Sequence, residues 1–590
     1  MDAQAVTRVA GGLLRGTEEE GVIAYRGVPF AQPPVGPLRF GSPLPPQPWA
    51  GIRDATRAGP ASYQLNATNQ DDVDRIIEDI DPGVPGVMAW PDYTNATYRH
   101  NHAAEDCLYL DIWVPASAPH GGLPVYVYFH GGANAVSSGS FGLERGANLA
   151  REANIIVVRP NYRLGALGWV HFGLISSDFA DAINLGVQDQ FAALTWVHDN
   201  IESFGGDSDN ITVGGESSGA TAVSHLLTNP RAHPYFRRAV LQSLSPFNPW
   251  CTQQRPEAVA VAQLYLELLG IDDPAQLRHI RPNQLLAAQN VLTRYFHPDR
   301  HLAWRPLGAV VAGDWVPQAP AEHLSQDPIP KRDLQVAFGF AKDEWQFFRG
   351  HSTTVRNGTA SDVIAVLAQV FGANGAQQLY QSYHQLYPGH PPGLLLSDIM
   401  SFEFFKLPSL AIAQNLAAQR IPVHVFQFSY DLPGLDGALR AVHTGDIPFL
   451  FRNHTERDLA WWPTFDGADR GEVQQISAQM GQLYASFIRG GNPGPSWPQF
   501  EATNQNVLWF GQTVKPAPGL LNREWDAFQR LGFGTVASLE NALVDNTRAA
   551  LNSTPPGHGQ RPCAFPSMPK PGRDVCSRRR EAPIALPIQD

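Results

Sequence analysis

Residues 211–220 read ITVGGESSGA. The apolar start of this stretch predicts a buried strand, and the small residues after Ser217 predict the beginning of a helix. Between them stands the pattern Gly-x-Ser-x-Gly, with Ser217 at its centre. A nucleophile on a sharp strand-to-helix turn has a strained backbone, and side chains two residues to either side would collide with neighbouring elements, which accounts for the glycines. The stretch therefore predicts a nucleophilic serine, with an ordinary glycine-rich turn as the alternative.

Short apolar runs bounded by turn residues recur along the chain and predict further buried strands. These runs are 125–129, 155–158, 239–241, 336–338 and 423–426. Between several of them lie longer segments with helical spacing, of which 187–201 is an example. Such alternation is typical of a largely parallel sheet with helices on its faces. The fold class is therefore α/β, with a large, mostly parallel central sheet flanked by helices.

The composition is that of a globular chain. Of 590 residues, 43% are hydrophobic and 17% are charged, which excludes a disordered acidic polypeptide. A net charge of −12 disfavours nucleic acid as a partner. No apolar run approaches the ~18 residues that a membrane-spanning helix needs, so we expect no transmembrane segment. The 53 glycines and 50 prolines predict many long loops.

Two segments show no clear periodicity. Residues 26–36 hold too many turn formers for a helix, and they predict an ordered loop that wraps the surface. Residues 62–104 are irregular, polar and acidic, and a solvated loop is preferred there over a cation site.

Metal and nucleotide chemistry are disfavoured. His297 and His301, and likewise His100 and His102, have ligand-like spacing, but Pro298 disfavours a regular helix around the first pair. The chain also lacks the GxxxxGK[ST] pattern of phosphate-binding loops. We therefore expect neither a metal nor a cofactor.

A serine nucleophile needs a base, an orienting carboxylate and donors for the oxyanion. The run His130-Gly131-Gly132-Ala133 follows a predicted strand, and its small residues allow main-chain N–H groups to approach a substrate oxygen beside the N–H of Ser218. Two more predicted strands are followed by candidate groups, the adjacent carboxylates Asp343 and Glu344 and the imidazole of His443. The chain order serine, acid, histidine is the one expected of an α/β-hydrolase.

Several motifs in the same order resemble the type-B carboxylesterase family, which includes the cholinesterases and bile-salt-activated lipases. They are the N-terminal segment around 26–36, Glu105–Asp111, Asn161–Gly165 and Phe204–Asp207. The resemblance covers about residues 6 to 512 and implies an α/β-hydrolase fold with long loop and helical insertions. Position by position, it implies the following roles. Ser217 is the nucleophile, Glu344 rather than Asp343 the acid, His443 the base, and Gly132, Ala133 and Ser218 are the oxyanion donors.

Three further residues gain a candidate role from this resemblance. Ser243 lies 26 residues after Ser217, where cholinesterases have a serine that supports the triad; a buried, satisfied hydroxyl is the alternative. Trp250 resembles the tryptophan beside the cholinesterase acyl pocket, although tryptophan is also common as core. Glu216 places a second negative charge near the site or serves packing between strands.

The chain also departs from the family. Ala133 replaces a third glycine, and it is followed by Asn134 where an apolar residue is usual. Ser62 stands where secreted members carry the cysteine that pairs with the counterpart of Cys107, so that disulfide is not expected. Trp345 replaces a glycine after the acid, and a longer loop around Trp90 prevents a role in cation recognition from being transferred to it.

The signals for localisation conflict. The N-terminus does not resemble a secretory signal, and the absent disulfide favours an intracellular compartment. Six glycosylation sequons leave secretion open. They begin at Asn66, Asn95, Asn210, Asn357, Asn453 and Asn552.

The sequence predicts a serine hydrolase that cleaves carboxylic esters of small molecules. Acyl transfer, or cleavage of an amide or thioester, would use the same groups, and a noncatalytic binding protein on the same scaffold is the alternative from another class. The complete triad argues against the last. We expect a catalytic domain over 1–520, a helical extension over 521–555 and a Pro- and Arg-rich tail over 556–590.

Overall fold

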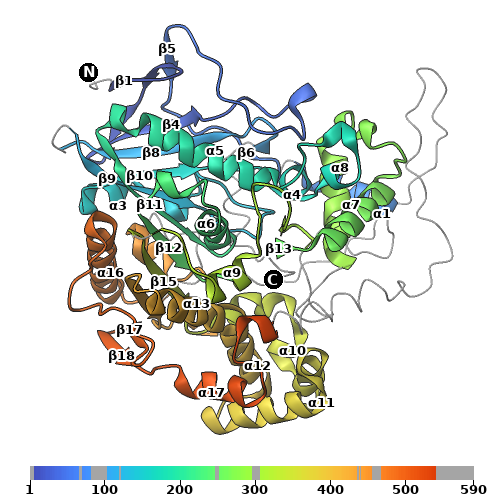
Figure 1. Cartoon of the computed structure of the whole chain (residues 1–590), viewed down its shortest axis with the longest axis vertical. Helices are drawn as coiled ribbons and strands as arrows, with labels where there is room; N and C mark the ends of the chain where they lie inside the picture. The colour runs from blue at the N-terminus through green and yellow to red at the C-terminus, as the bar shows by residue number, and fades with distance from the viewer. Residues whose placement is uncertain are drawn as a thin grey trace, which may run out of the picture.

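The computed structural model describes residues 5–65, 69–80, 103–117, 121–245, 252–295, 306–331, 333–434, 437–438, 440–454 and 467–539. An eleven-stranded sheet runs through the described part of the chain (Figure 1). From edge to edge its order is β18 (Val514–Pro518), β17 (Asn506–Phe510), β16 (Val423–Phe428), β15 (Gln335–Ala341), β12 (Arg238–Gln242), β11 (Gly206–Glu216), β9 (Leu123–Phe129), β10 (Ile156–Pro160), β8 (Tyr109–Pro115), β4 (Val22–Pro29) and β3 (Thr17–Glu19).

The middle of this sheet is parallel. All pairs from β10 through β9, β11, β12, β15 and β16 to β17 are parallel, and antiparallel strands close both edges. Five of the six predicted strands lie within a strand of this sheet, and the sixth, 155–158, begins one residue before β10; α5 (Leu185–Asn200) covers all but the last residue of the predicted helix 187–201. The predicted mostly parallel sheet is therefore confirmed, and it places the carboxyl ends of β11, β12, β15 and β16 along one edge.

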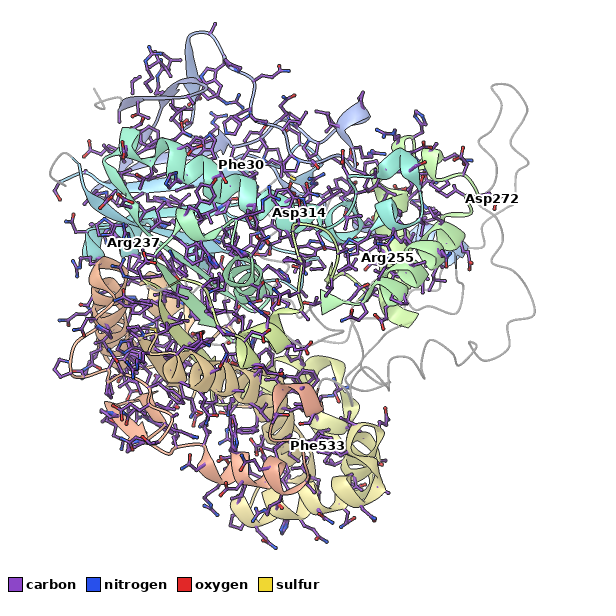
Figure 2. The ribbon with its side chains drawn as sticks, in the orientation of Figure 1. Phe30, Arg237, Arg255, Asp272, Asp314 and Phe533 are labelled. Atoms are coloured by element: carbon purple, nitrogen blue, oxygen red, sulfur yellow. The ribbon has the colours of Figure 1, made fainter. Side chains whose placement is uncertain are left out.

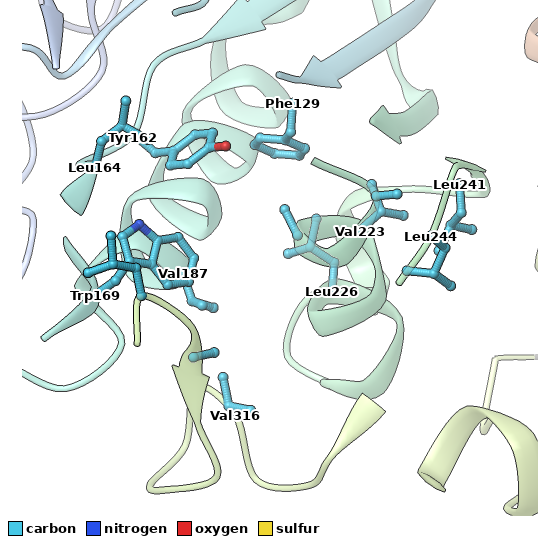
Figure 3. Packing of buried hydrophobic residues seen from close by; sticks show 14 of the residues in the cluster. Phe129, Tyr162, Leu164, Trp169, Val187, Val223, Leu226, Leu241, Leu244 and Val316 are labelled. Carbon is cyan, nitrogen blue, oxygen red and sulfur yellow. The ribbon is translucent and has the colours of Figure 1, made fainter. Parts of the chain in front are cut away.

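Alternating side chains of the sheet enter two hydrophobic layers. On β9, Val125, Val127 and Phe129 face α5 and α6 (Ser218–Thr228), whereas Tyr126 and Tyr128 face α3 (Ala147–Ala153) and α16 (Arg470–Gly490). Figure 3 shows the first layer, with Phe129 near Val223 and Leu226 of α6. Helices thus cover both faces, as buried parallel strands require.

A helical region packs beside the sheet, with α11, α12 and α17 at the bottom of Figure 1 and α13 against the sheet above them. It comprises α10 (Thr353–Asn357), α11 (Ala360–Leu386), α12 (Pro392–Ser401), the π-helix Phe402–Lys406, α13 (Leu407–Ala418) and α17 (Asn522–Arg530). Among the described residues, the remaining helices of four or more residues are α1 (Gln70–Ile80), α4 (Gly165–Trp169), α7 (Arg255–Leu269), α8 (Pro282–Tyr295), α9 (Pro320–Gln326), α14 (Ile447–Phe451) and the 3-10 helices Ile201–Phe204, Pro274–Arg278 and Glu344–His351.

Small sheets complete the described fold. They pair β1 (Val6–Val9) with β2 (Gly12–Arg15) and β5 (Ile52–Asp54), β6 (Ala61–Ser62) with β7 (Ala103–Ala104), and β13 (Thr252–Gln253) with β14 (Ala309–Val310).

The predicted surface loop over 26–36 is wrong in its first part. Residues up to Pro29 belong to β4 and pair with β8, and Val28 and Phe30 are buried (Figure 2 labels Phe30). The prolines that suggested a loop begin only at the end of the strand. Pairing with a central neighbour and burial of apolar side chains therefore override the local turn propensity.

The predicted loop over 62–104 is also wrong in part. Gln70–Ile80 forms α1, whose Val73 and Ile76 are buried at helical spacing and which packs against α8. The acidic residues that suggested a solvated loop lie in a helix that buries its few apolar side chains. Residues 66–68 and 81–102 lie outside the described residues, as do Trp250, Trp90, the four histidines considered as ligands, the end of the predicted helical extension from 540 and the whole predicted tail over 556–590.

Candidate active site

Ser217 sits on the turn between β11 and α6 with φ 56° and ψ −122°, a strained conformation for a residue with a side chain. A Cβ on Gly219 would lie 2.0 Å from the Phe129 carbonyl oxygen, and one on Gly215 would lie 2.4 Å from the Gly219 backbone. The two glycines are therefore required because the turn presses against the end of β9 and against itself. Within the described part of the chain, the Ser217 hydroxyl has no hydrogen-bond partner.

The acid and the histidine meet at the ends of adjacent parallel strands. Glu344 follows β15, and His443 follows β16 on a segment held by a bridge between Asp343 and Val442. Oε2 of Glu344 lies 2.5 Å from Nδ1 of His443, and both side chains are buried.

Two further groups fix the orientation of Glu344. Its Oε1 accepts hydrogen bonds from the Ser243 hydroxyl at 2.7 Å and from the Ala341 N–H at 2.7 Å. Asp343 instead forms ion pairs with Lys342 and Arg440 at 3.4 and 3.3 Å. The structure thus brings Glu344, and not its neighbour, to the imidazole, and it places Ser243 in contact with that acid.

Glu216 approaches the other nitrogen of His443. Oε1 of Glu216 lies 3.0 Å from Nε2 of His443, and the Glu216 side chain is buried. A Cβ on Gly131 would lie 2.7 Å from Oε2 of Glu216, which explains a glycine at that position. The imidazole is therefore flanked by two buried carboxylates.

This arrangement shifts two pKa values. Burial raises the pKa of Glu216, and the nearby His443 opposes that rise. Burial on its own lowers the pKa of His443, but Glu216 and then Glu344 outweigh it and raise that pKa to about 10. The protonation of His443 is thus coupled to the charge of Glu216.

Three aromatic rings surround His443, and sequence reasoning missed them. The ring centroids of Phe405, Phe347 and Phe348 lie 5.1, 5.3 and 5.8 Å from that of the imidazole. Trp345 packs behind them, with its ring centroid 4.7 Å from that of Phe348. The only sequence signal was the aromatic run that follows the acid, and a local pattern does not show which face of it meets the histidine.

The candidate oxyanion donors lie on a loop with an unusual backbone. Gly132 has φ 105° and Ala133 has φ 55°, and a Cβ on Gly132 would lie 2.3 Å from the Val136 carbonyl oxygen. Ser218 is the first residue of α6, where helical N–H groups have no internal acceptor. The main-chain N–H groups of Gly132, Ala133 and Ser218 have no acceptor among the described residues, so they are available to an incoming oxygen.

A buried ion pair fixes the loop after these donors, and sequence reasoning did not find it. Arg159 on β10 pairs with Glu144 and donates hydrogen bonds to the carbonyl oxygens of Phe141 at 2.9 Å and Ser138 at 3.1 Å. The signal was a single arginine at the end of an apolar strand, which carries no information about its partner.

A second buried carboxyl missed by sequence reasoning lies three residues after His443. Asp446 accepts a hydrogen bond of 2.6 Å from Gln242, and burial followed by the charge of Glu216 raises its pKa to about 7.

The expected absence of the family disulfide agrees with the local contacts. Cys107 is a free, buried thiol whose pKa is raised by burial to about 12. The Ser62 hydroxyl accepts a hydrogen bond of 2.9 Å from the Leu164 N–H. Among the described residues there is no group of three or more potential metal ligands. No described helix is long and apolar enough to cross a membrane.

A family model described as the carboxylesterase family matches residues 3–528. The chain belongs to the carboxylesterase family. It is therefore a carboxylic-ester hydrolase, and the resemblance drawn from the motifs is confirmed.

Individual hydrolases and esterases are similar over nearly the whole chain. A phenmedipham hydrolase of Pseudarthrobacter oxydans is 30% identical over 87% of this chain and 96% of that protein. A para-nitrobenzyl esterase of Bacillus subtilis is 29% identical over 84% of this chain and 93% of that protein. The solved structure of the Geobacillus stearothermophilus carboxylesterase EST55 superposes with a TM-score of 0.74 at 30% identity, over 89% of this chain and all of that one. The α/β-hydrolase fold is confirmed.

Proposed function

We propose that this carboxylesterase hydrolyses esters through an acyl-enzyme on Ser217, with His443 as general base and acid and Glu344 as the orienting carboxylate. The observation that carries the proposal is the 2.5 Å contact between Glu344 and Nδ1 of His443, together with a serine on a strained strand-to-helix turn. A carboxylate on Nδ1 fixes the tautomer in which Nε2 can accept a proton.

The reaction runs in two halves. Nε2 of His443 accepts the hydroxyl proton as Oγ of Ser217 attacks the carbonyl carbon, and the resulting imidazolium gives that proton to the leaving alkoxide. Water then attacks the acyl-enzyme with the same base, and the acid product leaves. The N–H groups of Gly132, Ala133 and Ser218 stabilise the oxyanion in both halves.

Glu216 has a part in this cycle that depends on its charge. An ionised Glu216 stabilises the imidazolium that forms in each transition state, because its oxygen lies 3.0 Å from Nε2. The same charge opposes the neutral imidazole needed to begin the reaction. Burial raises the pKa of Glu216, and protonation of Glu216 would remove one of the two charges that hold His443 in its imidazolium form.

Burst kinetics test the proposal. The purified chain is mixed with para-nitrophenyl butanoate, and the first turnover is followed together with the mass of the Ser217 peptide. The proposal predicts a burst, a butanoyl adduct on Ser217, and the loss of both in Ser217→Ala. Ser224→Ala on the same helix, whose hydroxyl bonds the Thr221 carbonyl, serves as the control and keeps both. Turnover that persists in a folded Ser217→Ala protein would overturn the proposal.

A further inference from the structure

The main chain around the candidate acid, residues 342–345, is here called the acid loop. On one side it is bonded to the segments that follow β16. The Lys342 N–H donates to the Phe428 carbonyl oxygen at 2.8 Å, and the Asp343 N–H donates to that of Ala441 at 2.9 Å. These bonds extend the pairing of β15 with β16 past the end of β15, so the sheet fixes one side of the acid loop.

Two side chains from the helical region also bond the acid loop. The Trp345 N–H donates to Oγ of Ser401 at 2.9 Å, and Nζ of Lys406 donates to the Lys342 carbonyl oxygen at 2.7 Å. Ser401 and Lys406 are both buried. The two bonds lie before and after Glu344 in the sequence, so together they hold the main chain that carries this carboxylate.

The π-helix places these two side chains on one face. Ser401 and Lys406 are five residues apart, and in an α-helix of 3.6 residues per turn they would point about 140° apart. Here the Leu407 N–H donates to the Phe402 carbonyl oxygen, five residues earlier, and this wider turn returns position 406 to the face of position 401. Pro408 gives a local cause, because its ring has no N–H for the carbonyl four residues earlier and would clash with it.

Packing alone does not explain a lysine at position 406. Lysine is almost never fully buried without a partner, and an apolar side chain would fill the same space without desolvating an amine. Burial lowers the pKa of Lys406, and the nearby Asp343, Glu524 and Asp398 oppose that change. Within the described part of the chain, the bond to the Lys342 carbonyl is the one hydrogen bond of this side chain. That bond is therefore what the lysine supplies.

We propose that Lys406 and Ser401 are positioning residues for the reaction, which hold the acid loop so that Oε2 of Glu344 meets Nδ1 of His443. The π-helix presents both side chains to the loop. It also places the ring of Phe405 against the imidazole, with 5.1 Å between the centroids. This inference rests on the proposed function, because both residues act only through Glu344 as the acid of the triad.

Lys406→Met tests the first of these residues, since it removes the donor and keeps a long side chain. We expect kcat for para-nitrophenyl butanoate to fall about tenfold and KM to stay within about twofold, because Glu344 acts mainly in the transition state. Lys406→Arg keeps a donor and should recover part of the loss. Lys331→Met is the matched control and should keep the wild-type kcat, because Lys331 is also buried and donates to a carbonyl oxygen, that of His233, at 2.9 Å.

A second background separates positioning from a general loss of structure. In Glu344→Gln there is no carboxylate left to position, so adding Lys406→Met should change the remaining kcat by less than about twofold. A purely structural role for Lys406 would instead lower kcat by the same factor in both backgrounds.

Ser401→Ala tests the other bond. A neutral hydrogen bond is weaker than one to a charged group, so we expect a smaller fall in kcat, of about threefold, and again no loss in the Glu344→Gln background. Ser409→Ala is the control, because Ser409 is equally buried and its hydroxyl donates within its own helix, to the Phe405 carbonyl at 2.7 Å. Should Lys406→Met fail to fold, Ser401→Ala decides the question by the same criteria.

The outcomes also separate this inference from the proposed function. A folded Lys406→Met protein with the kcat of the wild type, or equal losses in the two backgrounds, would overturn the inference alone. Failure of the wild type to form a burst on Ser217 would overturn the proposed function as well.

Discussion

Glu344 and Glu216 both approach His443, but their surroundings differ. Oε1 of Glu344 accepts two hydrogen bonds of 2.7 Å, while its Oε2 contacts Nδ1. Oε1 of Glu216 lies 3.0 Å from Nε2, but among the described residues no main-chain N–H or hydroxyl group anchors this oxygen as Ser243 and Ala341 anchor Glu344, and the Ser217 hydroxyl has no partner there.

This difference distinguishes two sides of the imidazole, the acid side with Glu344 and the nucleophile side with Glu216 and Ser217. The acid side is complete before substrate arrives, so the tautomer and orientation of the imidazole are set by the protein alone. The nucleophile side is incomplete, and groups left unpartnered there are the ones that a substrate can satisfy. Catalytic hydrogen bonds on such a side often tighten only when substrate binds.

Removing the charge of Glu344 should have the largest effect on the rate. Glu344→Gln keeps the volume but no longer fixes the required tautomer or stabilises the imidazolium, so we expect kcat to fall by about 10³–10⁴ with little change in KM. Asp343→Asn is the control, because Asp343 is equally buried and pairs with Lys342 and Arg440. Steady-state kinetics would contradict the assignment if Asp343→Asn lost activity and Glu344→Gln kept it.

Removing the charge of Glu216 should lower the rate less than removing that of Glu344, and it should change the pH dependence. Glu216→Gln weakens stabilisation of the imidazolium, and we expect kcat/KM on its plateau to fall about 10–100-fold.

The sign of the pH effect follows from the pKa of His443. Glu216 raises that pKa, so its neutral replacement lowers it, and the base becomes free at lower pH. The acidic limb of the kcat/KM profile should therefore move to lower pH. A profile of unchanged shape would show that Glu216 does not set the charge of His443.

Removing one of the hydrogen bonds to Glu344 should have a smaller effect on the rate. Ser243→Ala removes one of the two donors to Oε1, while the Ala341 N–H remains. A hydrogen bond to a charged group contributes about 1.5–3 kcal/mol, so we expect kcat to fall about tenfold and KM to stay within about twofold. Ser243→Thr, which retains a hydroxyl, should recover part of the loss. Equal losses in both variants would point to packing instead of the hydrogen bond.

A third buried carboxyl, that of Glu403, extends the comparison. It has neither the hydrogen bonds that hold Glu344 nor the contact that Glu216 makes with His443. Glu403 lies on the π-helix Phe402–Lys406, both its oxygens lack partners among the described residues, and burial raises its pKa to about 8. In the unfolded chain a glutamate titrates near ~4.3. As pH rises from there to about 8, the unfolded state loses its proton while the folded state keeps it, so folding stability falls.

Glu403→Gln removes that dependence. Denaturant unfolding at pH near 5 and near 8 should show little difference between the proteins at the lower pH and a variant more stable by on the order of a few kcal/mol at the higher pH. Exposed Glu501→Gln is the control and should unfold like the wild type at both. A Glu403→Gln protein that is less stable at the higher pH would contradict the account.

Much of the fold could be predicted because parallel strands buried on both faces are continuous apolar runs, as in β9 and β15. The local reason for the glycines around Ser217 was also predictable, since the strain of that turn is local. By contrast, β4 and α1 were misjudged because burial against distant partners decided their conformation. The rings around His443 and the Arg159 pair depend on contacts between segments far apart in sequence, which local patterns do not encode.

The most direct test of the divided site is the phosphonylation of Ser217. Wild type, Glu344→Gln and Glu216→Gln are treated with a para-nitrophenyl alkylphosphonate, and the modified peptide is identified and timed by mass spectrometry. The account predicts a single adduct on Ser217, formed much more slowly in Glu344→Gln and at an intermediate rate in Glu216→Gln. An adduct on another serine, or equal rates in all three proteins, would contradict it.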